Sequence, residues 1–477
     1  MDHRVETNLV PLAVDLDGTL IATDLLWEAI VALLKRNPLY LFLLPFWALK
    51  GPYFLKMKLA GRVDIDAASL PYRADFLAFL RAEHAKGRKL YLATGSPMAF
   101  AEKIAAHLGI FEGVLASVDG VNLTSLRKSA ALNGMFGPRG YDYAGNSRAD
   151  IAVFETARAS VIVAPDRAAA DFQRKTASLL FPAAAQGIRP VVKMLRMHQW
   201  AKNVLIAVPA VLANDLDRPA TLIAIALAFI AFCLAASAIY ILNDLIDLPL
   251  DRRHASKSKR SIASGAVSIP MALAIALALA LAAVSVSLLL PLAFQLVLGS
   301  YAVFTTAYSF ALKRMLLIDV LTLAGLYTVR VIAGAAATQI DVSFWLLAFS
   351  TFFFLSLALV KRFVELEQAA SNPALKIAGR GYRAADMHVI AEAGMASAFA
   401  AALVLALYID SSEVKELYGN PWLIWPLCPI VLYLAIRIWV LARRGEMHED
   451  PVVFLLSDWR SVMMVCVGAA LIFGASL

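Results

Sequence analysis

The sequence predicts two domains of different kinds, an α/β domain followed by an all-α membrane domain. Of its 477 residues, 60% are hydrophobic and 17% are charged, whereas soluble proteins are nearer half apolar and a quarter charged. The excess lies beyond Gly187, where apolar runs of roughly 18–22 residues recur, long enough to cross about 30 Å of hydrocarbon. We therefore expect one domain over residues 1–187 and a second over 188–477.

Strands and helices alternate in the first domain. The expected strands are short apolar runs that end at turns, at residues 9–14, 89–93, 113–117 and 141–144. This alternation predicts a parallel, Rossmann-like sheet. Such a sheet offers catalytic groups at the carboxyl ends of its strands.

A helical segment over residues 21–75 interrupts this pattern after the first strand. It contains the apolar stretch 39–49, which is broken by Pro45 and preceded by Pro38. The stretch is too short for a transmembrane helix, which needs about 20 apolar residues. A helical cap or a hairpin resting on the membrane fits it better.

The second domain predicts nine transmembrane helices. They are placed at about 197–213, 219–242, 270–289, 293–311, 317–336, 343–360, 392–409, 422–442 and 460–476. Lys and Arg gather in alternate loops, and the remaining loops hold only Arg218 and Lys415. Because positive loops stay in the cytoplasm, this bias predicts a cytoplasmic N-terminal domain and a C-terminus outside the cell or in the periplasm.

The compartment follows from the same bias. We expect a multi-pass protein of a bacterial-type inner membrane, since the first residues do not resemble a signal peptide. The net charge of +8 is explained by the cytoplasmic loops rather than by nucleic-acid binding. The cysteines Cys233, Cys428 and Cys466 lie in apolar runs, so we expect neither disulfides nor a cysteine metal site.

Three acids stand where the second predicted membrane helix ends. Asp244, Asp247 and Asp251 are spaced i, i+3 and i+7, which places them on one face of a helix, although Pro249 is expected to break the helix before Asp251. Carboxylates crowded at a membrane boundary are costly, and a divalent cation would relieve their repulsion. Oxygen ligands favour Mg²⁺ held by carboxylates and substrate phosphates. The alternative is that the acids only solvate a helix end.

A basic run follows the acids. Asn243 precedes the first acid, and Arg252, Lys257 and Arg260 come after the last. Bases next to a metal site can hold phosphate oxygens, so these residues are predicted to bind a diphosphate.

The run from Asn243 to His254 and the bases after it resemble the motif of the UbiA-type prenyltransferase superfamily, over about residues 188–477. The resemblance implies nine helices around a cavity open to the cytoplasm and to lipid. Further segments, Arg196–Asn203, Tyr308–Arg314 and Tyr327–Arg330, are similar to the branch that makes decaprenyl-phosphoryl-phosphoribose from phosphoribosyl diphosphate. The candidate substrate-binding residues in these segments are Lys202, Tyr308, Lys313 and Arg330.

One departure supports that branch. Aromatic-prenylating relatives carry a second acidic motif after the sixth helix, whereas this chain has Lys361 and Arg362 there. Fixed cations suit a lipid phosphate or a sugar phosphate better than a second metal. The alternative is that both cations only mark the cytoplasmic end of a helix. Arg330 is a functional candidate because it lies inside a membrane helix, although a structural pairing with a carboxylate is the other interpretation.

The N-terminal motif Asp15-Leu16-Asp17-Gly18-Thr19 resembles that of haloacid dehalogenase-like phosphatases, over about residues 1–180. Thr94, Lys128 and the segment Gly145–Asp150 match the later motifs. The resemblance implies that Asp15 attacks phosphorus, that Asp17 is the general acid and base, and that Thr94 and Lys128 hold phosphoryl oxygens.

A second Mg²⁺ would then lie among Asp15, Asp17, Asn146 and Asp150. Asn146 stands where relatives have an aspartate, which weakens the expected metal site. A degenerate domain kept as a scaffold is the alternative interpretation.

Together these features predict a Mg²⁺-dependent membrane transferase that moves 5-phosphoribose from phosphoribosyl diphosphate to a polyprenyl phosphate. The fused phosphatase would remove the 5-phosphate from the product. The first alternative is transfer of a prenyl chain to an aromatic acceptor, and the second is a membrane transporter. The expected partners are both substrates and membrane lipids, without nucleic acid; the oligomeric state stays open, with a homo-oligomer as one alternative.

Overall fold

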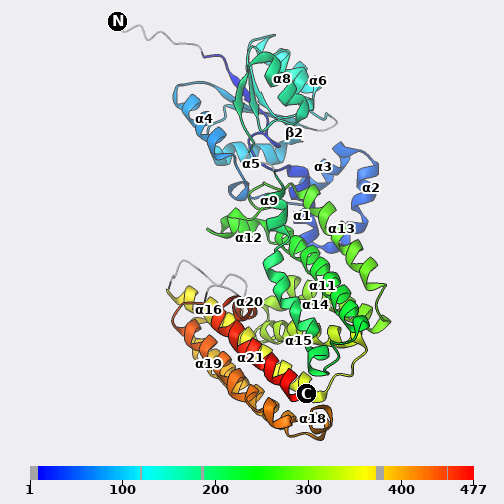
Figure 1. Cartoon of the computed structure of the whole chain (residues 1–477). Helices are drawn as coiled ribbons and strands as arrows, with labels where there is room; N and C mark the ends of the chain where they lie inside the picture. Colours follow the sequence, from blue (N-terminus) through cyan, green and yellow to red (C-terminus); the bar gives the residue numbers. More distant parts are fainter. Residues whose placement is uncertain (1–8, 119–120, 184–186, 372–380, 448–449, 477) are drawn as a thin grey trace. The chain divides into compact units, whose positions relative to one another are not determined.

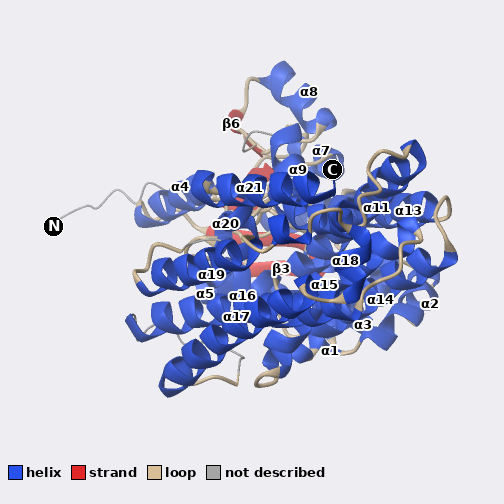
Figure 2. Ribbon diagram, turned by 60° about the horizontal axis from the view of Figure 1, so that its bottom comes forward, coloured by secondary structure: helices blue, strands red, loops and turns tan. Residues whose placement is uncertain are grey.

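The computed structural model describes residues 9–118, 121–183, 187–371, 381–447 and 450–476. The chain forms two compact units. Unit 1 comprises Met1–Leu195 and Ile241–Ile275, and unit 2 comprises Arg196–Tyr240 and Ala276–Leu477. The segment after the acidic motif therefore belongs to the same unit as the α/β domain. Helices make up most of the chain, as Figure 2 shows.

Unit 1 contains a six-stranded sheet in the order β3-β2-β1-β4-β5-β6, in which every neighbouring pair is parallel. The strands are β1 (Leu12–Val14), β2 (Leu90–Pro97), β3 (Gly113–Ser117), β4 (Asp142–Gly145), β5 (Ser160–Val163) and β6 (Leu179–Phe181). This confirms the predicted parallel sheet. The strands β5 and β6, at residues 160–163 and 179–181, are additional to the four that the sequence predicts.

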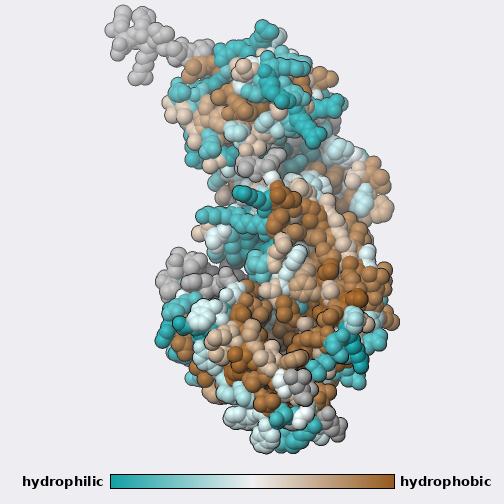
Figure 3. Space-filling model, viewed as in Figure 1, coloured by the Kyte–Doolittle hydropathy of each residue, from teal (hydrophilic) through white to brown (hydrophobic). Residues whose placement is uncertain are grey.

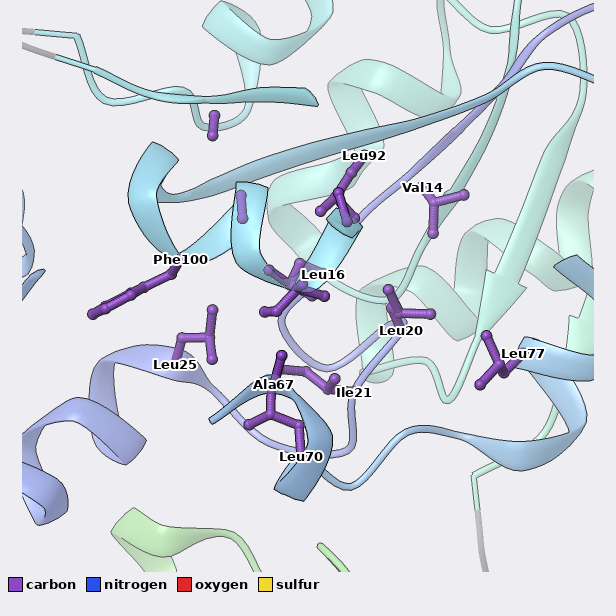
Figure 4. Close-up of a cluster of buried hydrophobic side chains, with 14 of the residues drawn as sticks. Val14, Leu16, Leu20, Ile21, Leu25, Ala67, Leu70, Leu77, Leu92 and Phe100 are labelled. Atoms are coloured by element: carbon purple, nitrogen blue, oxygen red, sulfur yellow. The ribbon is translucent and has the colours of Figure 1, made fainter. Parts of the chain in front are cut away.

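The core lies on both faces of the sheet. Successive strand residues point to opposite faces, so Leu12 and Val14 join one apolar cluster and Ala13 joins the other. Figure 4 shows part of the first cluster, in which Leu16 and Leu20 pack close to the start of the cap. The same chain reversal that buries these leucines presents Asp15 and Asp17 at the end of β1.

In its described residues, unit 1 also contains fourteen short helices. They are α1 (Leu25–Arg36), η1 (Pro38–Phe42), α2 (Leu44–Leu49), α3 (Pro52–Ala60), η2 (Ala67–Ser69), α4 (Ala74–Ala85), α5 (Met98–Leu108), α6 (Leu126–Phe136), η3 (Arg148–Asp150), α7 (Ile151–Phe154), α8 (Arg167–Thr176), α9 (Ile188–Met194), α12 (Leu248–Arg253) and η5 (Lys257–Lys259). The helices from α1 to η2 form the helical segment expected over 21–75. Its apolar stretch forms the short helices η1 and α2, because Pro38 and Pro45 each start a new helix.

The remaining helices are mostly long. They are η4 (Met197–Ala207), α10 (Val208–Leu212), α11 (Pro219–Ile246), α13 (Ile269–Ser287), α14 (Leu292–Phe310), η6 (Leu312–Arg314), α15 (Ile318–Thr338), α16 (Phe344–Ser371), η7 (Ala384–Asp386), α17 (Met387–Ile409), α18 (Ser412–Leu417), η8 (Pro421–Ile424), α19 (Leu427–Arg443), α20 (Pro451–Ser457) and α21 (Trp459–Ser476). Figure 3 shows hydrophobic residues gathered over α11 and α13.

Nine membrane spans are not confirmed. In the described part of the chain, six helices are long and apolar enough to cross a membrane, and the pair α20 and α21, bent by 80°, raises the number to seven at most. The first expected span, 197–213, is divided into η4 and α10. The fourth is the single helix α14, whose polar residues, such as Gln295 and Thr305, keep it out of the apolar set.

Close helix packing in unit 2 depends on Gly334 of α15. A Cβ atom built on Gly334 would lie 1.9 Å from the carbonyl oxygen of Ile206, a distance that no side chain could accept. Gly334 therefore lets α15 approach the η4 segment, as expected for small residues between membrane helices.

Candidate active sites

The phosphatase-like residues meet at the carboxyl ends of the parallel strands. Asp15 follows β1, Thr94 lies in β2, Asn146 follows β4, and Lys128 enters from α6. Asp15, Thr94 and Lys128 are all buried. The sheet thus brings together residues that are up to 131 positions apart.

Lys128 is the centre of this cluster. Its Nζ donates to Asp15 Oδ1 at 2.7 Å, to Asp150 Oδ1 at 3.2 Å and to the Tyr143 hydroxyl at 2.8 Å. Burial alone would lower the pKa of Lys128, but the two carboxylates raise it. Lys128 therefore stays positively charged, as a residue that holds phosphoryl oxygens must.

The two aspartates of the first motif have different surroundings. Burial raises the pKa of Asp15 to about 7, against the attraction of Lys128. Burial also raises the pKa of Asp17 to about 6. The Asp17 carboxylate accepts from the Leu25 backbone N–H at 2.9 Å and from the Ser96 hydroxyl at 2.6 Å. Asp17 is thus held in place and retains a proton at mildly acidic pH, as a general acid needs.

Asp150 is bound on both oxygens. Oδ1 accepts from Tyr143 and Lys128, and Oδ2 accepts from the backbone N–H groups of Asn146 and Ser147 and from the Ser147 hydroxyl. The sequence predicted a metal ligand at this position. That role stays a prediction, and the contact with Lys128 shows that the same carboxylate also orients this lysine.

Asn146 lies on the nucleophile side of the cluster. The Thr19 hydroxyl is 3.3 Å from Asn146 Oδ1 and 3.2 Å from Asp15 Oδ2. These two oxygens and the Asp17 carbonyl are the donors that would fit Mg²⁺, which prefers oxygen ligands. Only Asp15 among the three carries a full charge, so the site is weaker than one with two carboxylates.

The sequence did not single out Thr19, Ser96 or Tyr143. Thr19 belongs to the first motif itself, and Ser96 stands two residues after Thr94, whose hydroxyl accepts from the Ser96 backbone N–H at 3.1 Å. Their position beside known motif residues was the available signal. Nothing in the sequence indicated Tyr143, which looks like an ordinary strand residue.

The helix that carries the acidic motif is interrupted at Asp247, and not at Pro249 as the sequence predicts. The helix ends at Ile246, Asp247 caps the next helix α12, and Pro249 lies in the first turn of α12 rather than breaking it. The three acids therefore lie on two consecutive helices and the residue between them. Arg260 nevertheless joins two of them, with Nη1 at 3.1 Å from Asp244 Oδ1 and 2.5 Å from Asp251 Oδ2.

The charge pattern of this motif fits a cation. Among the residues that the structure describes, no three His, Cys, Asp or Glu side chains are grouped to hold a metal ion. Asp244 and Asp251 are buried and already converge on one positive group, the Arg260 guanidinium. Mg²⁺ that keeps several oxygens from a diphosphate needs only one or two carboxylates, which Asp244 and Asp247 can supply.

The other residues predicted here have separate surroundings. Arg252 turns to Glu28 of α1, with Nη2 2.6 Å and Nη1 3.1 Å from its carboxylate oxygens. Lys257 is exposed, and Asn243 is half-buried. Of the predicted diphosphate-binding bases, Arg260 contacts both Asp244 and Asp251.

In unit 2, two of the predicted cations, Lys202 and Lys361, pair with Asp450, a residue that the sequence analysis did not single out. Asp450 is the N-cap of α20, and its side chain is 6% exposed. Its carboxylate lies 2.8 Å from Lys202 Nζ and 3.4 Å from Lys361 Nζ. The Tyr327 hydroxyl donates to the same carboxylate at 2.8 Å. An aspartate directly before a proline is typical of a helix start, so its sequence context indicated a cap and nothing more.

Arg330 is buried and joins three elements. Its Nε donates to Asn203 Oδ1 at 2.9 Å, its Nη2 donates to the Tyr301 hydroxyl at 3.1 Å, and its Nη1 donates to the Leu326 carbonyl. These acceptors are uncharged, unlike the carboxylate considered from the sequence. These three contacts therefore do not neutralise the positive charge of the Arg330 guanidinium.

Arg362 differs from its neighbour Lys361. It is fully buried, with Nη2 2.5 Å from Asp319 Oδ2, and it also pairs with Glu365. The Tyr382 hydroxyl donates to Asp319 at 2.5 Å. The Arg362 guanidinium therefore points into the protein in this structure. The sequence predicts that it contacts a phosphate. Tyr308 and Lys313, in α14 and η6, are half-buried.

Comparisons with known proteins agree with both motifs. The family described as UbiA prenyltransferase matches residues 203–460, and that described as haloacid dehalogenase-like hydrolase matches residues 12–155. The chain is 38% identical to the uncharacterized protein y4nM of Sinorhizobium fredii, over 94% of this chain and 88% of that protein.

Two further proteins resemble the membrane part. A decaprenyl-phosphate phosphoribosyltransferase of Mycobacterium tuberculosis is 30% identical, over 60% of this chain and 95% of that protein. The structure of a UbiA homologue from Archaeoglobus fulgidus bound to GPP and Mg²⁺ covers 60% of this chain and 99% of its own, with a TM-score of 0.47 and 14% identity. The chain therefore belongs to the UbiA prenyltransferase family, in the branch similar to decaprenyl-phosphate phosphoribosyltransferases, and carries an N-terminal haloacid dehalogenase-like domain.

Proposed function

We propose that the protein transfers 5-phosphoribose from phosphoribosyl diphosphate to a polyprenyl phosphate. The observation that carries the proposal is the Asp450 cluster, in which Lys202 of η4 and Lys361 share one carboxylate. Lys361 stands where aromatic-prenylating relatives carry a second acidic motif. The similarity to the mycobacterial decaprenyl-phosphate phosphoribosyltransferase, which the chain covers over 95% of its length, supports the same substrate class.

The acidic motif would serve the leaving diphosphate. Asp244 and Asp247 would hold Mg²⁺, which when bound neutralises charge on the diphosphate oxygens. Arg260 lies against Asp244 and Asp251, so it can exchange these carboxylates for phosphate oxygens, which guanidinium groups bind well. Lys257, exposed on the same loop, adds a second cation.

The Asp450 cluster would serve an anionic group. Lys202 and Lys361 share one carboxylate, so the cluster carries more positive than negative charge, and Arg330 adds a further buried cation beside Tyr327. A phosphate would neutralise the excess. The reaction itself forms a bond between a polyprenyl phosphate oxygen and the anomeric carbon of the ribose, while the bond from that carbon to the diphosphate breaks.

The fused phosphatase-like domain would act on the product. Asp15, which accepts from Lys128, would attack the 5-phosphate, and Lys128 would hold its oxygens. Asp17, which accepts from Ser96, would give a proton to the leaving ribose oxygen. Attack on phosphorus gives an aspartyl-phosphate that water then hydrolyses. The chain would thereby carry out two consecutive steps.

The transferase proposal is tested with the purified full chain, Mg²⁺, polyprenyl phosphate and phosphoribosyl diphosphate labelled in the ribose. We expect labelled lipid, and an Asp244→Asn variant that forms at least about 100-fold less, the usual cost of removing a group that stabilises leaving-group charge. Asp217→Asn, at an exposed acid, is the matched control and should behave as the unchanged protein.

Two results would contradict the transferase proposal. One is the absence of labelled lipid from an active preparation. The other is turnover of a prenyl diphosphate with an aromatic acid, which would favour the aromatic prenyltransferase alternative. Solute flux in liposomes without any lipid product would favour a transporter.

The phosphatase step is tested on the lipid product. The unchanged protein should release the 5-phosphate as inorganic phosphate, and Asp15→Asn should accumulate the phosphorylated lipid. If the phosphorylation state of the lipid is the same with both proteins, the second step does not occur, while the transferase proposal is unaffected.

A further inference from the structure

The cap of the phosphatase-like domain carries an apolar surface that the proposed reaction does not use. We call it the cap patch. It consists of six large side chains of η1, α2 and the residue between them, with exposed fractions between 45% and 84%: Leu39, Leu41, Phe42, Leu43, Phe46 and Leu49. Monomeric soluble proteins rarely expose contiguous apolar patches of this kind without a partner.

The cap patch is not a poorly packed part of the hydrophobic core. The opposite side of the same segment already packs on the core through Tyr40, Leu44 and Trp47. The rings of Tyr40 and Trp47 lie 5.8 Å apart. The segment therefore has an inner face that stabilises the cap and an outer face that needs a different partner.

The charges around the patch have one sign. No Asp or Glu occurs between Glu28 and Asp64. The same stretch contains six cations, Lys35, Arg36, Lys50, Lys56, Lys58 and Arg62. Lys50 and Lys58 both lie over the ring of Phe54, at 5.2 and 5.3 Å from its centroid, so two of these charges gather next to the patch.

This combination selects the partner. Leu and Phe side chains on one face, aromatic residues at its edge and surrounding Lys and Arg are the features of helices that lie in a membrane interface. Anionic lipid headgroups attract such cations. We propose that the cap patch binds the surface of an anionic bilayer, with its leucine and phenylalanine side chains inserted among the lipids and its lysines at the headgroups.

A second copy of the chain is a poor partner for the same surface. In a symmetric dimer the same patch would face itself, and the cations of this acid-free stretch would oppose one another. A bilayer accepts the apolar side chains and neutralises the cations at once.

The patch is connected to the phosphatase-like site through α3. Lys56 Nζ donates to the Gly95 carbonyl at 3.0 Å, directly after Thr94, and the Tyr53 hydroxyl donates to the Val118 carbonyl at 2.8 Å. The helix that follows α2 thus contacts the backbone of the site. Bilayer binding by the patch would present the site to phosphate groups carried by lipids, and this consequence rests on the proposed function.

The binding itself is tested by labelling the full chain in nanodiscs that contain anionic lipid. Cys233, Cys428 and Cys466 are replaced by alanine, and a nitroxide is attached at Phe46→Cys or, as a control, at Arg81→Cys on the exposed side of α4. The expected result is that oxygen relaxes the label at position 46 more than a water-soluble nickel complex does, with the reverse order at position 81. Equal access of the nickel complex to both positions would overturn the proposal.

The label at position 46 could instead be shielded from both oxygen and the nickel complex, with cross-linked dimers present. This result would identify a second copy as the partner and overturn the proposal of bilayer binding. The functional consequence is tested separately with Phe42→Gln/Phe46→Gln. Hydrolysis of a lipid phosphomonoester in the nanodiscs should fall severalfold, whereas hydrolysis of p-nitrophenyl phosphate should be unchanged. If the unchanged protein hydrolyses neither substrate, the proposed phosphatase function fails while the labelling result still decides the bilayer proposal.

Discussion

The carboxylate of Glu28 and the guanidinium of Arg252 form a two-point ion pair across 224 positions of the chain, at 2.6 and 3.1 Å. Both side chains are less than 10% exposed. Thr23 also donates to Glu28, and Arg252 Nε donates to the Ala263 carbonyl. The pair fastens the loop after the acidic motif to the α/β domain within unit 1.

The backbone supports the same attachment. Gly265 has φ +76°, and a Cβ atom built on it would lie 2.4 Å from the Ala22 carbonyl oxygen. The loop therefore approaches the start of the cap more closely than any other residue would allow, since only glycine adopts this conformation readily.

Breaking the pair should destabilise the protein. Glu28→Gln leaves the Arg252 charge buried without its carboxylate, which costs about 3–5 kcal/mol, and should lower transferase activity by loosening the loop. Asp66→Asn is the matched control, because it breaks the exposed pair with Arg253, worth about 0–1 kcal/mol. Thermal unfolding followed by intrinsic fluorescence measures both; equal melting temperatures would show that the buried pair has no special weight.

In unit 2 we likewise expect that breaking the ion pairs of Asp450 costs more stability than breaking an exposed ion pair. Asp450→Asn leaves Lys202 and Lys361 without their shared carboxylate, at a cost of about 3–5 kcal/mol, and should reduce labelled-lipid formation. Asp410→Asn removes the partner of the exposed Lys415 and should change the stability by less than about 1 kcal/mol. Melting temperatures in one detergent allow the comparison. A milder effect at Asp450 than at Asp410 would contradict the importance of the cluster.

The substitution Asn146→Asp should raise the affinity of the phosphatase-like site for Mg²⁺. Asn146→Asp adds a second charged oxygen beside Asp15, and ligand charge is a main determinant of Mg²⁺ affinity. The Mg²⁺ concentration for half-maximal phosphatase activity should fall by about tenfold, a change in the range that single groups around metal sites produce. Titration of activity on p-nitrophenyl phosphate measures it, with Asp166→Asn, near the same loop, as control. An unchanged titration curve would argue against a ligand role for position 146.

The pKa of Asp17 predicts a pH profile. Burial raises it from 3.8 to about 6, so the protonated general acid persists up to about pH 6 and is lost as the pH rises further. Ionisation of the Asp15 nucleophile, whose pKa burial raises to about 7, affects all substrates alike. The ratio of kcat/KM for an alkyl phosphate to kcat/KM for p-nitrophenyl phosphate, whose leaving group needs little protonation, should therefore fall above about pH 6. Identical profiles for both substrates would exclude Asp17 as the acid.

The sequence alone determined the class of each domain. Strand lengths and motif positions predicted the parallel sheet with Asp15, Lys128 and Asn146 at its carboxyl edge, because parallel strands necessarily end on the same side. Apolar runs predicted most of the membrane helices, and the two motifs indicated both families. These features depend on local periodicity and composition, which a sequence displays directly.

The partners of the charged residues became apparent only in the folded chain. The tertiary structure paired Arg252 with Glu28, buried Arg362 against Asp319, and placed Asp450 between Lys202 and Lys361. It also divided the first expected span into short helices and exposed the outer face of residues 39–49. A charge can find its counterpart anywhere in the chain, so distance along the sequence carries no information about which carboxylate it meets.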